Sequence, residues 1–244
     1  MRNESDWTPS KFVLRGDRLV ASRNPEEVSL GSRFIGDIQG AVYQRLISAH
    51  AKGRLADLGC GKCPLYVVYK PLVTEAICVD WPGSLHTSPF LDLAADLNEP
   101  LKLETAAFDT VLMTDVLEHI RNPAALMSEI ARILRPKGRL LLTVPFLYWI
   151  HEQPYDYFRY TRYALSEFCR TADLEVVELA EYGGAPEVLL DIVGKQLARS
   201  DRLAEIYSPL ASWLAERRFA KRISRNTQDK FPLGYSLVAS KRET

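Results

Sequence analysis

The spacing of apolar residues changes along the chain from one helical segment to a series of short runs. In residues 33–51, apolar side chains recur three and four positions apart, which is typical of a helix with one buried face. From residue 54 onward, helical patterns separate short apolar runs, which lie at residues 54–58, 76–80, 108–114 and 139–144. Strands that alternate with helices in this way indicate βαβ units and a parallel sheet.

The later part of the chain predicts further helices and two more strands. A helix is expected over residues 123–134, because Asn122 can cap its first turn, Pro123 suits its first position and residues 135–138 form a turn signal. The remaining elements are a short helix at 163–170, a strand at 174–179, a long helical stretch at 186–222 and a last strand at 234–240. Two strands joined by a long helical stretch can pair antiparallel at the sheet edge, so we expect a mixed sheet.

Composition narrows the class of protein. The 244 residues are 47% hydrophobic and 25% charged, which is typical of a globular protein, and we expect a single domain over residues 1–244 with an irregular lead-in at 1–30. Thirty-one basic residues balance thirty-one acidic ones, and this zero net charge argues against a nucleic-acid partner. The longest apolar stretch, residues 140–150, is too short for a transmembrane segment. The polar first residues and four cysteines favour a reduced, cytoplasmic protein.

The strongest chemical signal is the turn RLADLGCGKCP at residues 54–64. Asp57 ends the apolar run, and Gly59 and Gly61 follow it. Glycines at such a turn allow positive φ and a close approach of ligand to backbone. Amides at the start of a following helix, which Pro64 could open, can hold a carboxylate. Since ligands of doubly wound sheets bind at the carboxyl ends of the strands, the loop predicts a nucleotide-like ligand.

The loop alone fits a nicotinamide enzyme and a methyltransferase equally well. The pyrophosphate fingerprint requires a glycine where this chain has Pro64, and a dinucleotide site normally has an apolar residue where this chain has Asp57. Asp80 ends the next strand and is well placed to accept hydrogen bonds from ribose hydroxyls, but both classes share that feature. The rest of the chain has to decide between them.

The order and spacing of several further motifs resemble the class I S-adenosylmethionine-dependent methyltransferases of the type 11 and type 23 groups. The motifs are DLGCG at 57–61, VDW at 79–81, ADL at 95–97, FDTVLMTDVLEHI at 108–120 and the segment 122–146 that follows. The likeness covers residues 50–182 and the final GYSLVAS strand. It implies an α/β fold with a Rossmann-like, doubly wound, mixed seven-stranded sheet, a reversed C-terminal strand, and added N- and C-terminal helices.

The resemblance also implies S-adenosylmethionine as the cofactor and a role for each residue around it. The methionine half would lie against Asp57, Gly59, Cys60 and Gly61, the ribose against Asp80, the adenine against Trp81, Asp96 and Leu97, and the sulfonium side against Thr114 and Asp115.

This chain departs from the family at Cys63, where a third glycine is common. Cys60 and Cys63 then form a C-x-x-C spacing, which in other proteins binds a metal or acts as a redox pair. Because the sequence offers no second pair of metal ligands, we expect no metal site here. Cys78 and Cys169 are expected to be buried packing residues.

The segment 145–161 is the predicted acceptor side. It follows the strand at 139–144, is dense in aromatic and ionisable residues, and carries an H-x-x-P-Y-D-Y-x-R pattern that recurs in the resembled family. Alignment supplies much of the catalysis of an in-line methyl transfer, but a hydroxyl acceptor must also lose a proton. We predict His151 as the general base, with an acceptor pocket shaped by Tyr155, Asp156 and Arg159. The alternative is that Asp156 and Arg159 form a structural ion pair.

His119 in the LEHI segment is the competing general base. It is expected about one turn beyond Asp115, with Leu117 and Ile120 pointing inward. The alternative is a histidine that supports this loop by hydrogen bonding. His50 and His86 have polar surroundings and are expected at the surface.

The helical stretch at 186–222 is longer than one crossover helix needs. We interpret it as an insertion that forms a lid or a homodimer face, with core packing as the alternative. Its basic end, between residues 217 and 225, fits an anionic ligand or membrane surface, or simply a solvated helix end.

These observations predict an S-adenosylmethionine-dependent methyltransferase that acts on a small molecule. The expected reaction is O-methylation of a sugar, glycan precursor or natural-product hydroxyl. One alternative is a nicotinamide-dependent oxidoreductase, although the chain has no recognisable Tyr-x-x-x-Lys pair. The other is a non-catalytic scaffold that binds the cofactor.

Overall fold

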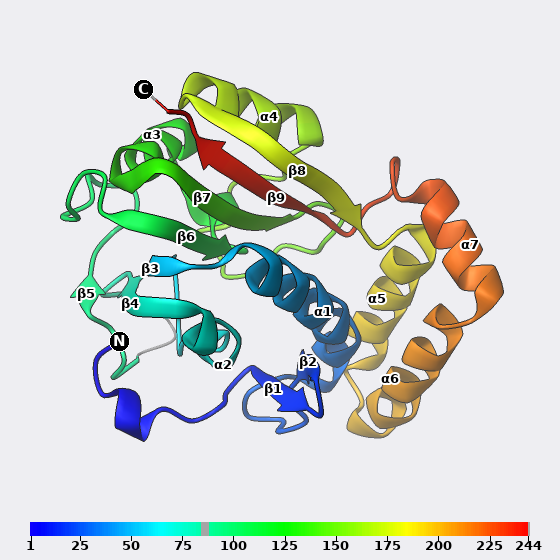
Figure 1. Ribbon diagram of the computed structural model, residues 1–244. Coiled ribbons are helices and arrows are strands. Elements are labelled where there is room, and N and C mark those ends of the chain that lie inside the picture. Colours follow the sequence, from blue (N-terminus) through cyan, green and yellow to red (C-terminus); the bar gives the residue numbers. More distant parts are fainter. Residues whose placement is uncertain (84–87, 244) are drawn as a thin grey trace.

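A seven-stranded sheet forms the centre of the computed structural model, which describes residues 1–83 and 88–243 (Figure 1). In spatial order its strands are β5 (Leu93–Ala94), β4 (Val73–Asp80), β3 (Gly53–Leu58), β6 (Phe108–Thr114), β7 (Leu134–Pro145), β9 (Gly234–Lys241) and β8 (Leu174–Tyr182). Neighbouring strands from β5 to β7 are parallel, whereas β9 is antiparallel to both β7 and β8. The expected mixed sheet with a reversed C-terminal strand is confirmed.

Helices cover both faces of the sheet. They are α1 (Arg33–His50), α2 (Tyr66–Tyr69), α3 (Pro123–Ile133), α4 (Arg162–Thr171), α5 (Ala185–Leu197), α6 (Asp201–Ala215) and α7 (Arg218–Thr227). Successive side chains of a strand point to opposite faces, so Leu55 packs with Leu46 of α1, while its neighbour Ala56 belongs to the core that contains Leu126 of α3. Figure 1 shows α1 and α2 on one side of the sheet and α3 on the other.

Both ends of α3 lie close to where the sequence predicts them. The Asn122 side chain accepts a hydrogen bond of 3.2 Å from the Ala125 amide, and Pro123 occupies the first turn. The helix ends at Ile133, and β7 begins at Leu134. The predicted turn at 135–138 lies inside β7 as an irregularity: Leu134 pairs with Phe108 of β6, the next pair is Arg139 with Thr110, and Lys137 has φ +64°.

The predicted irregular lead-in contains a β-hairpin. Strands β1 (Phe12–Arg15) and β2 (Arg18–Ala21) pair antiparallel through a turn with Gly16 at φ +63°. The hairpin packs closely on α1 at Gly40, where an added Cβ would lie 2.6 Å from the Leu19 carbonyl oxygen. Two four-residue strands give little sequence signal, and this contact with α1 supplies the stability that the pattern does not reveal.

The stretch 186–222 is not one helix. It divides into α5, α6 and α7. The Tyr207 ring of α6 packs closely against Gly194 of α5, where an added Cβ would lie 3.1 Å from the ring. The Tyr207 hydroxyl donates a 2.9 Å hydrogen bond to the Leu190 carbonyl. Large apolar side chains remain exposed on these helices, at Leu189, Ile192, Val193, Leu203, Ile206, Leu210 and Trp213. A lid or homodimer role for this region stays a prediction.

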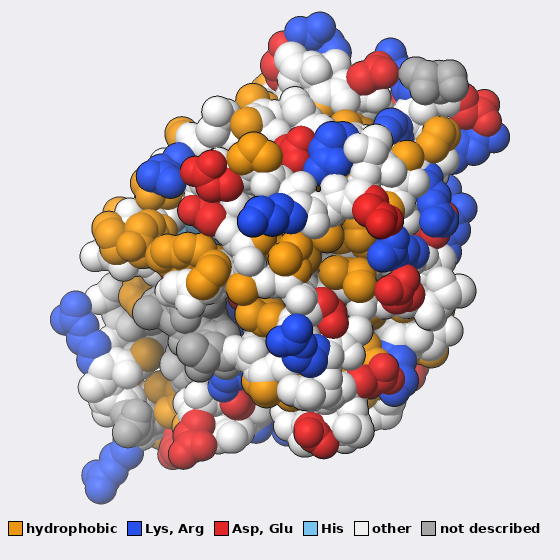
Figure 2. Space-filling model, turned by 90° about the vertical axis from the view of Figure 1, so that its left-hand side faces the viewer, with side chains coloured by type: hydrophobic (Ala, Val, Ile, Leu, Met, Phe, Trp, Pro, Cys, Tyr) orange, Lys and Arg blue, Asp and Glu red, His pale blue; other side chains and the backbone are white. Residues whose placement is uncertain are grey.

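The surface offers no single dominant charge on the face seen in Figure 2, where Lys and Arg side chains are interspersed with Asp and Glu and hydrophobic side chains gather toward one side. Among the described residues, no helix has the length and apolar character needed to cross a membrane.

Candidate cofactor and acceptor site

Two adjoining pockets open at the carboxyl ends of the parallel strands. The larger has a volume of about 600 Å³, a size typical of small-molecule sites, and the smaller has about 200 Å³. All ten predicted cofactor residues line one pocket or both. The larger pocket is lined by Asp80, Trp81, Asp96 and Leu97, the smaller by Asp57, Cys60 and Thr114, and both by Gly59, Gly61 and Asp115. The structure therefore brings these residues together, while their contacts with the cofactor stay predictions.

The glycine loop has the backbone conformation expected of a ligand cradle. Gly59 and Gly61 have φ values of +74° and +50°. A Cβ on Gly59 would overlap the Val116 side chain, so a larger residue does not fit. Asp57, at the end of β3, is buried, and its Oδ2 accepts a 3.0 Å hydrogen bond from the Tyr69 hydroxyl. Burial, and then the negative charge expected at Cys78, raise the pKa of Asp57 well above its usual value.

The ribose and adenine end is built on β4 and the segment after β5. Asp80 accepts hydrogen bonds from the Gly61 amide at 2.8 Å and from the Trp81 amide at 2.7 Å. The Trp81 ring is 37% exposed and meets the Tyr155 ring edge-on, with centroids 5.2 Å apart, so a flat face remains available to a base. Asp96 is fixed by two 2.9 Å hydrogen bonds from Asn98.

Asp115, at the end of β6, is held by two residues that the sequence analysis did not single out. Its Oδ2 accepts hydrogen bonds from Gln39 at 2.7 Å and from the Tyr43 hydroxyl, both on α1. Burial first, and then the charge of Asp115, raise the pKa of Tyr43, so the hydroxyl keeps its proton and donates. Gln39 and Tyr43 are four residues apart and so share one face of α1, and this spacing was the available signal for the site.

Glu118, a third residue that the sequence analysis did not single out, is completely buried next to two histidines. Neither of its carboxylate oxygens has a hydrogen-bond partner among the described residues. Its Oε1 lies 3.7 Å from Nε2 of His119 and 3.7 Å from Nε2 of His151. Burial raises the pKa of Glu118 well above its usual value, and the charge of Asp115 raises it further.

Polar contacts at Nδ1 fix the orientation of both histidine rings. His119 Nδ1 lies 2.9 Å from the Tyr155 carbonyl oxygen, and His151 Nδ1 lies 3.4 Å from the Trp149 carbonyl oxygen and 3.2 Å from Asp156 Oδ2. Because these oxygens accept, each Nδ1 carries a hydrogen, and each Nε2 faces Glu118. The ligand atoms of Glu118, His119 and His151 lie within 4.8 Å of one another, so this set could also hold a divalent cation.

The two candidate bases do not lie equally close to the larger pocket. His119 lines it, together with Tyr155 and Glu152, whereas His151 is not among the described residues that line it and packs edge-on against His119 with centroids 4.7 Å apart. Burial, and then the neighbouring His119, lower the pKa of His151, so its imidazole is neutral at neutral pH. As expected, Leu117 and Ile120 are buried.

Asp156 and Arg159 form the ion pair that was the alternative prediction. Arg159 Nη2 lies 2.8 Å from Asp156 Oδ2 and also donates to the Trp149 carbonyl. Burial alone would raise the pKa of Asp156, but hydrogen bonds from Arg159 and the His151 amide lower it to about 2. Neither residue lines the two pockets described, so the structure places them as supports of the 145–161 segment rather than in a pocket wall. Tyr155 does line the larger pocket, as predicted.

The start of the N-terminal hairpin supplies a pocket wall that the sequence did not predict. Phe12 of β1 and the two residues before it, Ser10 and Lys11, line the smaller pocket. No motif in this polar segment marks it, because its position depends on packing against α1.

The remaining histidines lie apart from this site. His50, expected at the surface, is partly buried, and its Nδ1 lies 2.8 Å from Arg139 Nη1. His86 lies outside the described residues.

The chain matches known proteins in sequence and in fold. The chain belongs to the type 23 methyltransferase domain family, whose model matches residues 38–222. It is therefore an S-adenosylmethionine-dependent methyltransferase of class I, and the nicotinamide interpretation of the glycine loop is set aside.

Curated relatives and a solved structure add detail. The chain is 25% identical over 194 residues to a ubiquinone biosynthesis O-methyltransferase from Ralstonia nicotianae, covering 71% of this chain and 69% of that protein. It is 31% identical over 103 residues to the protein of that description from Xanthomonas oryzae, of which it covers 43%. A SAM-dependent methyltransferase from Archaeoglobus fulgidus shares the fold with a TM-score of 0.56 and 17% identity, over 86% of this chain and 97% of that one.

Proposed function

We propose that this methyltransferase methylates a hydroxyl group of a small molecule, such as a sugar, a glycan precursor or a natural product. The observation that carries the proposal is the convergence of His119 and His151 on the buried Glu118 beside the predicted cofactor pocket. A scaffold that only binds the cofactor has no need of such a group of proton acceptors. The relatives described as O-methyltransferases support a hydroxyl acceptor.

The pocket residues fit the cofactor that the family uses. When bound, S-adenosylmethionine supplies a methyl group on a positively charged sulfur. Asp80 and Asp96 present oxygen acceptors for ribose and adenine, and Trp81 presents a ring face. Asp115, at the junction of both pockets, fixes a carboxylate beside the predicted sulfonium position. These residues orient the reacting groups, and alignment of this kind can supply roughly 7–11 kcal/mol of a barrier.

The group of Glu118, His119, His151 and Asp156 accepts the proton that the acceptor hydroxyl loses. Asp156 orients His151 through Nδ1, and the neutral Nε2 faces Glu118. The His119 ring packs edge-on against the His151 ring and lines the larger pocket, so it connects His151 with the pocket. A base, oriented by a carboxylate and kept neutral by burial, is the arrangement that general-base catalysis requires, and it contributes about 10²–10⁴-fold.

Transfer of a labelled methyl group tests the proposal. We expect the purified chain, given S-adenosylmethionine and a panel of hydroxylated sugars and phenols, to form a methyl ether identified by mass spectrometry. Product labelled on nitrogen or carbon would contradict the hydroxyl assignment, and cofactor binding without any turnover would favour the scaffold alternative.

His119→Ala and His151→Ala should each reduce kcat by at least about 100-fold while leaving cofactor affinity nearly unchanged. Wild-type rates in the His151 variant would assign the base to His119 alone, and wild-type rates in both would leave alignment as the source of catalysis.

A further inference from the structure

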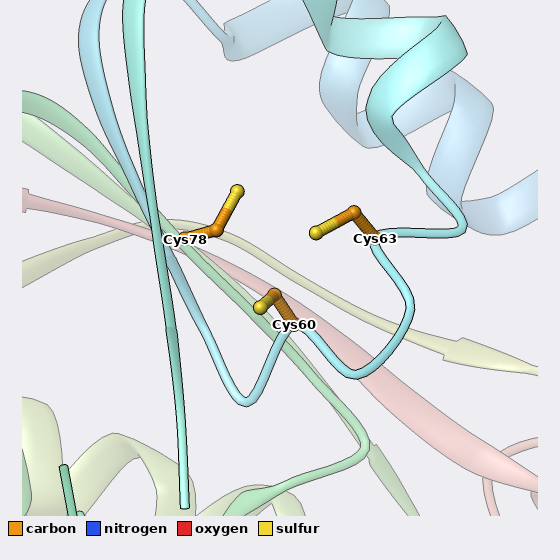
Figure 3. A group of neighbouring side chains, drawn as sticks. All are labelled: Cys60, Cys63 and Cys78. Carbon is orange, nitrogen blue, oxygen red and sulfur yellow. The ribbon is translucent and has the colours of Figure 1, made fainter. Parts of the chain in front are cut away.

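Three cysteines meet behind the cofactor loop (Figure 3). Cys60 and Cys63 lie on the loop between β3 and α2, and Cys78 lies on the neighbouring strand β4. Their Sγ atoms are all within 4.8 Å of one another, and the side chains are 4%, 0% and 0% exposed. The C-x-x-C pair therefore has a third thiol that the sequence could not reveal, because Cys78 reaches it through sheet pairing, opposite Asp57.

The backbone on both sides of the cluster is fixed by hydrogen bonds. The Cys60 amide donates to the Val79 carbonyl of β4 at 3.2 Å, and the Cys63 amide donates to the Cys60 carbonyl at 2.8 Å. The Cys78 amide donates to Asp92 at 2.8 Å. The three thiols are thus presented by a tight turn and a central strand, and they meet without any rearrangement of the chain.

Cys63 has a backbone conformation that disfavours a side chain. Its φ is +52°, in the left-handed region that glycine adopts without steric cost. The side chain is nevertheless buried beside Cys60 and Cys78. The position therefore adds a third sulfur to the cluster at a cost in backbone strain that glycine would avoid.

We propose that Cys60, Cys63 and Cys78 bind a thiophilic divalent cation, for which Zn²⁺ is the probe. Zinc–sulfur bonds are about 2.3 Å long, so thiolates around one ion lie about 3.8–4.0 Å apart. The observed separations, all within 4.8 Å, require only small side-chain rotations to reach that geometry. Sulfur ligands select such ions over Mg²⁺ and Ca²⁺.

Binding replaces three S–H bonds by three metal–sulfur bonds and releases three protons. The Tyr69 hydroxyl lies 3.7 Å from the Cys78 sulfur, so a polar group borders the cluster. Tyr69 also bonds Asp57, so oxygen donors stand next to the cluster for a fourth ligand position.

Titration of the whole chain with Co²⁺ and then Zn²⁺ tests the proposal. The protein is stripped with chelator, kept anaerobic and reduced with a phosphine rather than a thiol. We expect one equivalent of Co²⁺ to produce thiolate-to-cobalt charge-transfer absorption, which one equivalent of Zn²⁺ then abolishes. Cys63→Gly, which suits the φ of that position and should fold normally, is expected to weaken binding by at least about 100-fold. Cys78→Ser should do the same, whereas the control Cys169→Ser, at a buried cysteine of α4 in the core on the other side of the sheet, should bind like the wild type.

Three results would overturn the proposal. One is the absence of any Co²⁺ binding to the wild-type protein. Another is undiminished binding in Cys63→Gly with an unchanged thermal transition. The last is cobalt bound without thiolate absorption, which would place the ion at oxygen and nitrogen ligands such as Glu118, His119 and His151.

Discussion

Gln39 of α1 donates a 2.7 Å hydrogen bond from Nε2 to Oδ2 of Asp115 at the end of β6. Tyr43, one turn further along α1, donates to the same oxygen, and Thr143 of β7 donates to Oδ1 at 2.9 Å. One carboxylate therefore joins the first helix to two central strands at the place where the cofactor is expected. Asp115 itself has φ +53°, a conformation that these partners stabilise.

Tyr43→Phe tests this junction. The ring is 3% exposed and stays in place, but Asp115 loses a donor, and a hydrogen bond to a charged group is worth about 1.5–3 kcal/mol. We expect affinity for S-adenosylmethionine, measured by calorimetry, to fall about tenfold or more. Tyr163→Phe, which removes a hydroxyl from a ring that is 79% exposed, is the matched control and should bind normally. Equal affinities in the two variants would mean that Asp115 does not act on the cofactor.

Asp80→Asn tests the predicted ribose contact. The variant keeps the size of the side chain but weakens the acceptor that holds the Gly61 amide and, as we predict, the ribose hydroxyls. S-adenosylhomocysteine should bind about tenfold more weakly or worse. Glu104→Gln, on a side chain that is 82% exposed, makes the same chemical change away from the pocket and should have no effect. Unchanged binding in Asp80→Asn would remove Asp80 from the cofactor site.

The pH dependence of kcat/KM follows from His151. Burial, and then His119, lower its pKa below the ordinary histidine value of about 6.5. Since the neutral imidazole is the active base, activity should be complete at pH 7 and decrease only as the pH falls through this lowered pKa. A steady-state profile between pH 5 and pH 8, with cofactor saturating, measures the midpoint. An acid limb centred above about 6.5 would exclude His151 as the base.

Asp156→Asn should move that acid limb. The negative charge of Asp156 raises the pKa of His151, so removing the charge lowers the pKa further and shifts the limb to lower pH. kcat should also fall, because the His151 ring loses the carboxylate that orients Nδ1. A merely structural role would reduce the amount of folded protein without moving the midpoint, and the profile distinguishes the two.

Gly40→Ala tests the hairpin wall. The new Cβ would lie 2.6 Å from the Leu19 carbonyl oxygen, a backbone atom that cannot move without displacing β2. Overpacking of this kind costs about 1–3 kcal/mol, so we expect a lower free energy of unfolding in urea. Ser48→Ala, at an exposed position on the same helix, should unfold like the wild type. A hairpin that tolerates the alanine would not be rigidly docked on α1.

The sequence predicted the parts of the molecule that local pattern determines. Strand β6 begins and ends where its apolar run does, at Phe108 and Thr114, and the ten predicted cofactor residues converge because they follow strands whose carboxyl ends share one edge. The breaks between α5, α6 and α7 escaped prediction, since apolar spacing continues across them.

Features that depend on distant contacts were out of reach. The burial of Glu118 contradicts the usual exposure of acidic residues, and only the fold brings His151 against it. Likewise, Cys78 joins Cys60 and Cys63 through parallel pairing of β3 with β4, a relationship that no local spacing encodes.

The carboxylate of Asp115 has a consequence for turnover. Its oxygens accept hydrogen bonds from Gln39, Tyr43 and Thr143, which fix the carboxylate in place. A sulfonium next to it is attracted, but once the methyl group has left, the sulfur is neutral and that attraction is gone. On the predicted placement of the sulfonium beside Asp115, this attraction is confined to the charged cofactor, so release of the spent cofactor breaks no ion pair at this side chain.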